Sequence, residues 1–146
     1  DAAVTISQVV GEYQDKLQAQ DIEIVVNEAK NPANIMADGR HLWRVFDNIM
    51  SNICKYTQDH TRVYVNVEDA GDQVRMIFKN ISKYPLNISS DELMERFVRG
   101  DASRNTEGHG LGLSIASSLI ALMDGQLTID IDGDLFKMTV AMKKQA

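Results

Sequence analysis

Hydrophobic and polar residues follow two different periods along this chain, and each period predicts its own kind of element. Apolar side chains recur every three to four residues in three long segments, which is typical of helices with one buried face. These helices are expected from a capping box at Thr5, over about 39–57, and over 111–124. Alternating or short apolar runs predict strands over 22–26, 35–37, 63–67, 74–79, 126–131 and 135–142.

Turn signals separate these segments and suggest how they connect. The turns at 70–72 and 132–134 join strands into hairpins, and Gly125 is expected at the C-cap position of the third long helix. A short helix is expected over 89–98, followed by a polar linker over 99–108. Amphipathic helices combined with hairpins predict an α+β fold, a two-layer α/β sandwich whose mixed, mostly antiparallel sheet is covered on one face by helices.

The composition describes one globular domain over residues 1–146 and argues against several kinds of partner. Hydrophobic content is 44% and charged content 25%, both ordinary for a folded domain. The net charge of −6 and the lack of a basic run argue against nucleic acid as a partner. No apolar run approaches the ~20 residues of a membrane span, and no signal peptide is visible, so no direct membrane contact is expected. Because the chain starts at Asp1, we expect an upstream part to be missing.

Cysteine and histidine add little to this account. The single Cys54 cannot form an internal disulfide, and its position beside an apolar helix face predicts a small buried side chain in a reducing compartment. The three histidines at 41, 60 and 109 have no metal-binding spacing and are expected at the surface.

A glycine-rich segment opens the third long helix and predicts close approach to a ligand. Glycines at 108, 110 and 112 leave no Cβ in the way, and the helix that follows directs its free N–H groups and positive dipole end at the loop. This arrangement favours phosphate. The spacing matches neither the dinucleotide fingerprint nor the common P-loop. Taken alone, the pattern is equally compatible with a simple turn.

The second long helix places two asparagines on an otherwise core-like element. With about 100° per residue, Asn52 falls about 40° from Asn48, with Lys55 and Tyr56 within about 80° on the same arc. A solvated face is usually built from better helix formers, because asparagine lowers helix stability. An amide oxygen is a neutral, hard ligand that suits Mg²⁺, and Lys55 lies one turn further on, where it could reach a phosphate. This arc therefore predicts a site for Mg²⁺ and phosphate.

Three motifs in order resemble those of a known family. The segment 48–56 is similar to an N box, Glu95-Arg96-Phe97-Val98-Arg99-Gly100 to an F box, and Gly108-His109-Gly110-Leu111-Gly112-Leu113 to a second glycine box. Over nearly its whole length the chain resembles the catalytic ATP-binding domain of bacterial sensor histidine kinases. That domain shares its Bergerat-type fold with gyrase, a heat-shock chaperone and mismatch-repair ATPases.

The resemblance implies a role for each matching residue. Asn52 would hold Mg²⁺, Lys55 and Tyr56 would contact phosphate and sugar, and Asn48 would orient an incoming histidine. The ATP-binding set that it implies is Asn48, Asn52, Lys55, Tyr56, Asn80, Ser82, Phe97, Gly108, His109, Gly110, Leu111, Gly112 and Leu113. Arg99 and Arg104 would join Asn48 and Lys55 as catalytic residues by neutralising the charge of the transferring phosphoryl group.

The first glycine box departs from the family's Asp-x-Gly-x-Gly pattern. Counted back from Phe97 without gaps, the adenine-binding aspartate is replaced by Asn80, and the glycines by Ser82 and Tyr84. Asparagine can still accept from the adenine amino group, so weak, adenine-selective binding is expected.

The resemblance also implies partners, and two alternatives remain open. The phosphate would pass from ATP to a histidine on a separate dimerisation domain and from there to a response regulator, and the chain would be a cytoplasmic domain of a membrane-anchored sensor kinase. One alternative is a stand-alone serine kinase of the anti-sigma type, which the upstream sequence would distinguish. The other is a nucleotide-free interaction module, which a titration with Mg²⁺ and ATP would reveal.

Overall fold

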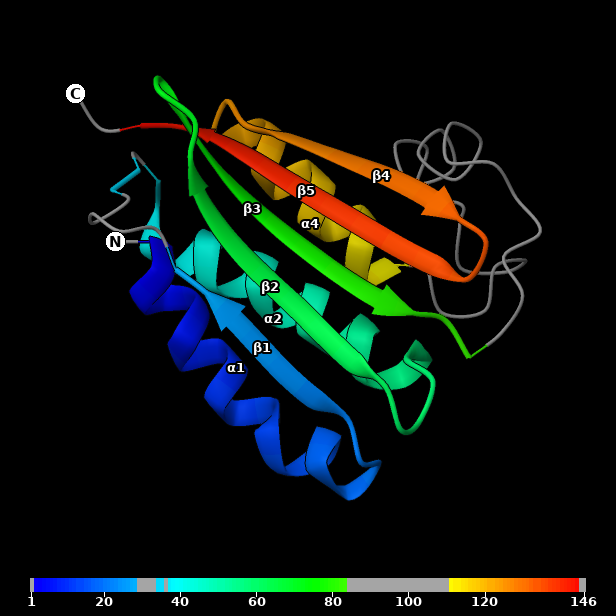
Figure 1. Cartoon of the computed structure of the whole chain (residues 1–146). Coiled ribbons are helices and arrows are strands. Elements are labelled where there is room, and N and C mark those ends of the chain that lie inside the picture. Colours follow the sequence, from blue (N-terminus) through cyan, green and yellow to red (C-terminus); the bar gives the residue numbers. More distant parts are fainter. Residues whose placement is uncertain (1, 29–33, 36, 84–110, 145–146) are drawn as a thin grey trace.

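The chain folds into two layers, a five-stranded sheet and a layer of helices on one of its faces (Figure 1). The computed structural model describes residues 2–28, 34–35, 37–83 and 111–144, so the turn at 31–32, the short helix at 89–98 and the linker at 99–108 lie outside the described residues. The described elements are α1 Ala2–Ala19, β1 Glu23–Asn27, α2 Gly39–Tyr56, β2 Arg62–Asp69, β3 Gln73–Ile81, α4 Leu111–Leu122, β4 Gln126–Asp132 and β5 Leu135–Lys143.

The sheet confirms the predicted mixed and mostly antiparallel pairing. Its order is β1-β2-β3-β5-β4; β1 runs parallel to β2, and the other neighbours are antiparallel. The predicted strand at 35–37 is wrong, because Ile35 makes only an isolated bridge with Lys144. Three residues after Ile35, Asp38 is the N-cap of α2. Its carboxylate accepts hydrogen bonds from the backbone N–H groups of Arg40 at 2.9 Å and His41 at 3.3 Å.

The core lies between the sheet and the helices. On β3, Val74, Met76 and Phe78 are buried at alternate positions, as a half-covered strand requires. The Phe78 ring centroid lies 6.0 Å from that of Phe46 on α2, which joins the central strand to the central helix. The helix α2 packs against both α1 and α4 and therefore occupies the middle of the helical layer.

The bounds of the two outer helices, α1 and α4, differ from the predicted ones. The helix α1 begins at Ala2, which is fully buried in the core, so the capping box predicted at Thr5 is wrong. The C-terminal end of α4 also corrects a prediction. Asp124, not Gly125, takes the left-handed conformation with φ +61°, while Gly125 donates its N–H to Ile120 at 2.9 Å in a Schellman arrangement.

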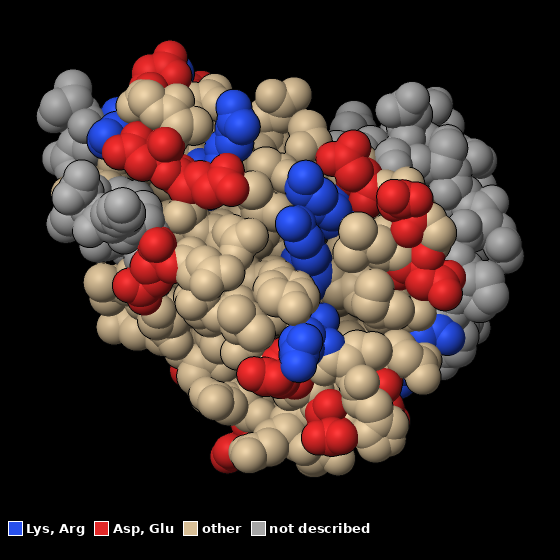
Figure 2. Space-filling view, in the orientation of Figure 1, with Lys and Arg blue, Asp and Glu red and all other residues tan. Residues whose placement is uncertain are grey.

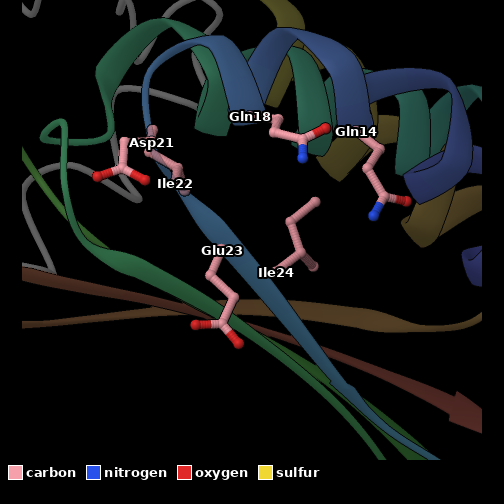
Figure 3. A pocket seen from close by; sticks show the side chains of 6 residues that line it. All are labelled: Gln14, Gln18, Asp21, Ile22, Glu23 and Ile24. Carbon is pink, nitrogen blue, oxygen red and sulfur yellow. The ribbon is translucent and has the colours of Figure 1, made fainter.

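The turn after α1 repeats this arrangement. Asp21 has φ +56°, and Ile22 donates its N–H to the Leu17 carbonyl at 2.9 Å. The chain then enters β1, a strand of five residues at the edge of the sheet. A hollow of about 240 Å³ separates it from α1, and Gln14 and Gln18 extend from the helix toward it (Figure 3). A short edge strand under polar side chains offers little template for pairing with another chain. Among the described residues, no helix is both long and apolar enough to cross a membrane.

Candidate functional site

The helix α2 buries polar atoms that have no partner among the described residues. Asn52 is 5% exposed, and neither its amide oxygen nor its amide nitrogen accepts or donates a hydrogen bond there. The amide nitrogen of Asn48, one turn earlier, is in the same state. Leaving a buried polar group unsatisfied costs roughly 1–3 kcal/mol. Two such groups on one arc indicate a surface kept for a ligand rather than for the core.

A third amide lies at the end of the central strand. Asn80 follows Val74, Met76 and Phe78 in the alternation of β3, so its side chain faces the helical layer. It is 2% exposed, and its amide oxygen has no partner in the described part of the chain. The predicted strand ended one residue before Asn80, whereas β3 continues to Ile81 and so includes this residue.

Backbone contacts hold the end of α2 over the end of β3. Lys83 donates its N–H to the Tyr56 carbonyl at 2.8 Å, and Gln58 donates to the Ile81 carbonyl at the same distance. Between these two hydrogen bonds, Thr57 and Ser82 form an isolated antiparallel β-bridge. The last turns of α2 and the residues around Asn80 therefore meet at one end of the interface between helices and sheet.

Sequence reasoning missed Thr57, which belongs to the same end of the molecule. Its side chain is fully buried at the C-cap of α2, and its hydroxyl oxygen has no hydrogen-bond partner among the residues that the structure describes. The only signal in the sequence was its position directly after the N-box segment, which does not distinguish a capping residue from a site residue.

The other predicted site residues fall into three groups. Ser82 is buried, Tyr56 is half-buried, and Lys55 is exposed beside a hollow of about 480 Å³ between α1 and α2. Leu111 and Gly112 begin α4, and the Leu113 side chain is fully buried in the core, so that only its backbone is left to contact a ligand. The remaining predicted residues lie outside the described residues: Phe97, Arg99, Arg104, Gly108, His109 and Gly110.

The opposite face of the sheet has the character of an ordinary solvated surface. Figure 2 shows Lys and Arg side chains on it in a band between separate groups of Asp and Glu. Opposite charges also face one another across the strands, as Arg75 does Glu68 and Lys137 does Asp130. This compensation contrasts with the buried, neutral and unpartnered amides on the helical side. Amide oxygens of that kind fit a hard cation such as Mg²⁺.

Comparison with known proteins identifies the family. The family model described as histidine kinase-, DNA gyrase B- and HSP90-like ATPase matches residues 37–144, from the start of α2 to the end of the sheet. The chain belongs to this ATPase family. The match confirms the resemblance inferred from the N box, the F box and the second glycine box, and α1 and β1 precede the matched segment.

Curated relatives include sensor proteins that are considerably longer than this chain. The probable sensor protein PcoS of Escherichia coli is 36% identical over 112 residues, which cover 74% of this chain and 24% of PcoS. The sensor protein VanS of Enterococcus faecium is 31% identical over 122 residues, covering 82% of this chain and 31% of VanS. The chain thus spans about a quarter to a third of the length of these relatives.

Solved structures of other proteins confirm the fold of this chain. The catalytic domain of the histidine kinase ThkA superposes with a TM-score of 0.82 at 21% identity, covering 96% of this chain and 90% of that one. Full-length ShkA in complex with AMPPNP gives a TM-score of 0.81 at 23% identity, covering 100% of this chain and 30% of that one. The two-layer arrangement predicted from the sequence is therefore correct.

Proposed function

We propose that this chain is the ATP-binding catalytic module of a sensor histidine kinase. It binds ATP with Mg²⁺ at the end of α2 and donates the γ-phosphate to a histidine on a separate dimerisation domain. The observation that carries the proposal is a set of buried amide atoms without partners among the described residues, on the helical side of the sheet: the nitrogen of Asn48, both amide atoms of Asn52 and the oxygen of Asn80. Membership in an ATPase family and relatives that are named sensor proteins support it.

Each residue has a defined task in this proposal. The amide oxygen of Asn52 ligates Mg²⁺, which supplies charge neutralisation for the phosphates. Asn80 faces adenine, with Ser82 beside it, and Lys55 and Tyr56 contact phosphate and sugar. The backbone of 108–113 cradles the phosphates, and Phe97 of the F box belongs to the same ATP-binding set. Phosphoryl transfer depends mainly on positioning and electrostatics, to which Arg99 and Arg104 contribute positive charge.

Asn48 determines which reaction the site favours. An amide cannot accept a proton as a carboxylate can, so Asn48 does not activate water, and hydrolysis of ATP is slow. It orients the incoming histidine of the dimerisation domain instead. The phosphohistidine then supplies a response regulator. In this proposal the chain is a cytoplasmic domain of a membrane-anchored sensor.

Calorimetric titration of the chain with ATP, with and without Mg²⁺, tests the proposal. We expect the wild-type chain to bind ATP more tightly with Mg²⁺, and Asn52→Ala to lose the Mg²⁺-dependent part while keeping its fold. Asn66→Ala is the matched control, because Asn66 is an amide on β2 that bonds Asn27 at 2.8 Å, away from α2. A wild-type chain that binds no ATP would overturn the proposal and favour the nucleotide-free interaction module. The departure of segment 80–84 from the family's first glycine box is the sequence feature that favours this alternative.

The adenine assignment has its own variant. A carboxylate accepts a hydrogen bond more strongly than an amide does, by about 1 kcal/mol, so Asn80→Asp should tighten ATP binding about five- to tenfold. The wild-type chain should also prefer ATP to GTP. Equal affinity for both nucleotides, with no gain from the substitution, would show that Asn80 does not face the base.

A further inference from the structure

The helix α1 contacts α2 through a hydrogen bond that reaches the residue next to Asn48. The Tyr13 hydroxyl lies 2.6 Å from the carboxylate oxygen Oδ1 of Asp47 and donates to it. The same hydroxyl lies 3.3 Å from the backbone carbonyl oxygen of Asp47. Two residues 34 positions apart in the sequence are thus joined at the turn of α2 that carries Asn48.

The surroundings of Tyr13 keep this donor in place. Its ring packs against the core, and the ammonium group of Lys16 lies 5.4 Å from the ring centroid. Burial, followed by the hydrogen bond to Asp47, raises the pKa of Tyr13 well above its ordinary value. The hydroxyl therefore remains protonated and able to donate throughout the physiological pH range.

The position of Asp47 on the helix gives this contact its consequence. Asp47 lies about 100° around the helix axis from Asn48 and about 140° from Asn52. A contact on the α1 side of α2 therefore acts together with the core packing of Phe46 and Ile49 to limit the rotation of the helix, and with it the direction of the amides on the adjoining arc. The buried amide nitrogen of Asn48 and both amide atoms of Asn52 make no hydrogen bond among the described residues, so the placement of the helix decides where these side chains point.

We propose that Tyr13 is a positioning residue, which acts through Asp47 to set the rotation of α2 and so to aim Asn48 and Asn52 into the nucleotide site. The inference rests on the proposed function for its effect on ATP, but its structural part concerns the ligand-free chain. It also extends beyond the family's matched segment, because α1 precedes residue 37. A shift of α1 would reach the phosphate-binding end of the site through this contact.

The first test compares Tyr13→Phe with the wild-type chain. We expect the side-chain amide resonances of Asn48 and Asn52 to move in the ligand-free ¹⁵N spectrum, while those of Asn66 stay in place. Affinity for ATP with Mg²⁺ should fall about threefold to tenfold, because amides that point in the wrong direction lose about the worth of one hydrogen bond to the ligand. Tyr64→Phe is the matched control, because it removes a hydroxyl from β2 on the sheet face away from the helices and should change neither readout.

The second test separates positioning from a general loss of stability. Asp47→Asn keeps an oxygen that can accept from Tyr13 and should bind ATP as the wild type does, whereas Asp47→Ala should match Tyr13→Phe. The double variant Tyr13→Phe with Asp47→Ala should lose no more than either single one. Unchanged Asn48 and Asn52 resonances in Tyr13→Phe would overturn the inference. If the wild-type chain bound no ATP, the proposed function would fail, and the ligand-free spectra would still decide whether Tyr13 positions α2.

Discussion

Asn52 is a residue at which stability and binding make opposite demands. Its amide is 5% exposed and satisfied by no described neighbour, so the folded, ligand-free chain bears the cost of desolvating it. Leucine has nearly the same shape and no such cost. We predict that Asn52→Leu raises the free energy of unfolding by about 1–2 kcal/mol, as measured by urea denaturation, and abolishes Mg²⁺-dependent ATP binding.

The matched substitution is Asn66→Leu, at an amide whose oxygen already accepts from Asn27 at 2.8 Å. It should bring no stabilisation, because it removes a satisfied group. A destabilised Asn52→Leu chain would mean that the amide has partners in the folded state, and that the site is not kept open for a ligand.

The junction between α4 and β4 depends on a glycine for a reason that a sequence pattern does not reveal. A Cβ at Gly125 would lie 2.9 Å from the Ala141 carbonyl oxygen and 3.0 Å from Cγ2 of Ile120, and would collide with the Met142 side chain. We predict that Gly125→Ala lowers the free energy of unfolding by about 1–3 kcal/mol in thermal or urea denaturation.

Gly39→Ala is the control for this substitution. Gly39 begins α2, and a Cβ there would meet nothing within 4 Å. Alanine favours the helix over glycine, so this variant should be as stable as the wild type or slightly more so. Equal losses at both positions would show that the close approach between α4 and β5 is not what requires glycine.

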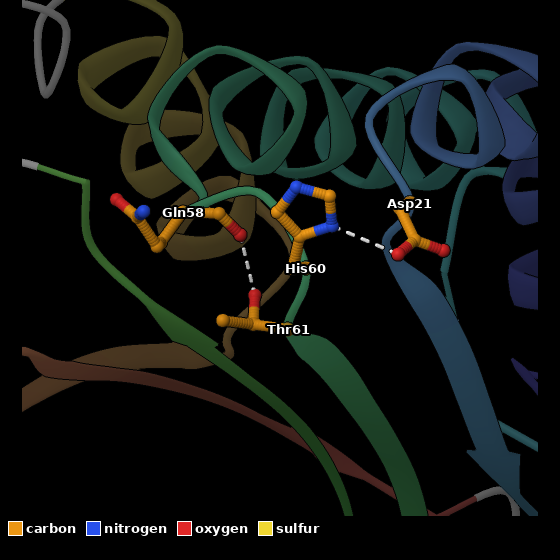
Figure 4. Close-up of polar contacts among 4 residues, drawn as sticks. All are labelled: Asp21, Gln58, His60 and Thr61. Carbon is orange, nitrogen blue, oxygen red and sulfur yellow. Dashed lines mark hydrogen bonds and ion pairs between the residues drawn. The ribbon is translucent and has the colours of Figure 1, made fainter.

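An ion pair between His60 and Asp21 joins the turns after α1 and α2, and its strength depends on pH (Figure 4). His60 Nδ1 lies 2.8 Å from Asp21 Oδ2, and both residues have positive φ angles, +64° and +56°. The bond to the Asp21 carboxylate raises the pKa of His60 above its ordinary 6.5. Its contribution to stability is therefore complete below about pH 6 and is lost as the pH rises through the raised value.

We predict that the stability advantage of the wild-type chain over His60→Asn shrinks between pH 6 and 8, as urea midpoints across this range would show. Asparagine tolerates a positive φ, so this variant removes the titrating group without adding backbone strain. The effect is small, because the side chains of His60 and Asp21 are 77% and 80% exposed. A constant difference across the range would mean that the ion pair does not form in solution.

Periodicity predicted the long helices and the five strands of the sheet, but it also predicted a strand at 35–37 that is absent, and it did not give the ends of the elements or the contacts between them. The arc of α2 could be recognised because asparagine is a poor helix former and two of them share one face. The left-handed residues Asp21 and Asp124 could not, since their conformation follows from how the helices meet the next strand. The hydrogen bond between Tyr13 and Asp47 could not be predicted either, because local sequence patterns do not show which residues 34 positions apart come into contact.

On the scale of the whole molecule, the proposed function gives this chain the nucleotide side of the reaction and places the acceptor histidine on a separate domain. His41 lies in the first turn of α2, and His60 is bonded to Asp21. In the proposed function, the amide of Asn48 activates no water either. We predict that the isolated chain, incubated with γ-³²P-labelled ATP and Mg²⁺, incorporates no stable label and releases phosphate only slowly. Label on any of its three histidines would contradict this.

The place of β5 in the sheet has a consequence for how the chain reaches its native state. Although β5 is the last strand in sequence, it lies between β3 and β4 and pairs with β3 from Gln73↔Lys143 to Ile81↔Leu135. No part of the chain before residue 135 can therefore complete the centre of the sheet. Such sequence-distant pairing requires a large loop to close before the paired residues come into contact, which makes folding slower than it would be with local pairing only. Until then the edge of β3 remains open to strands of other molecules, and a chain shortened before β5 would keep that edge exposed.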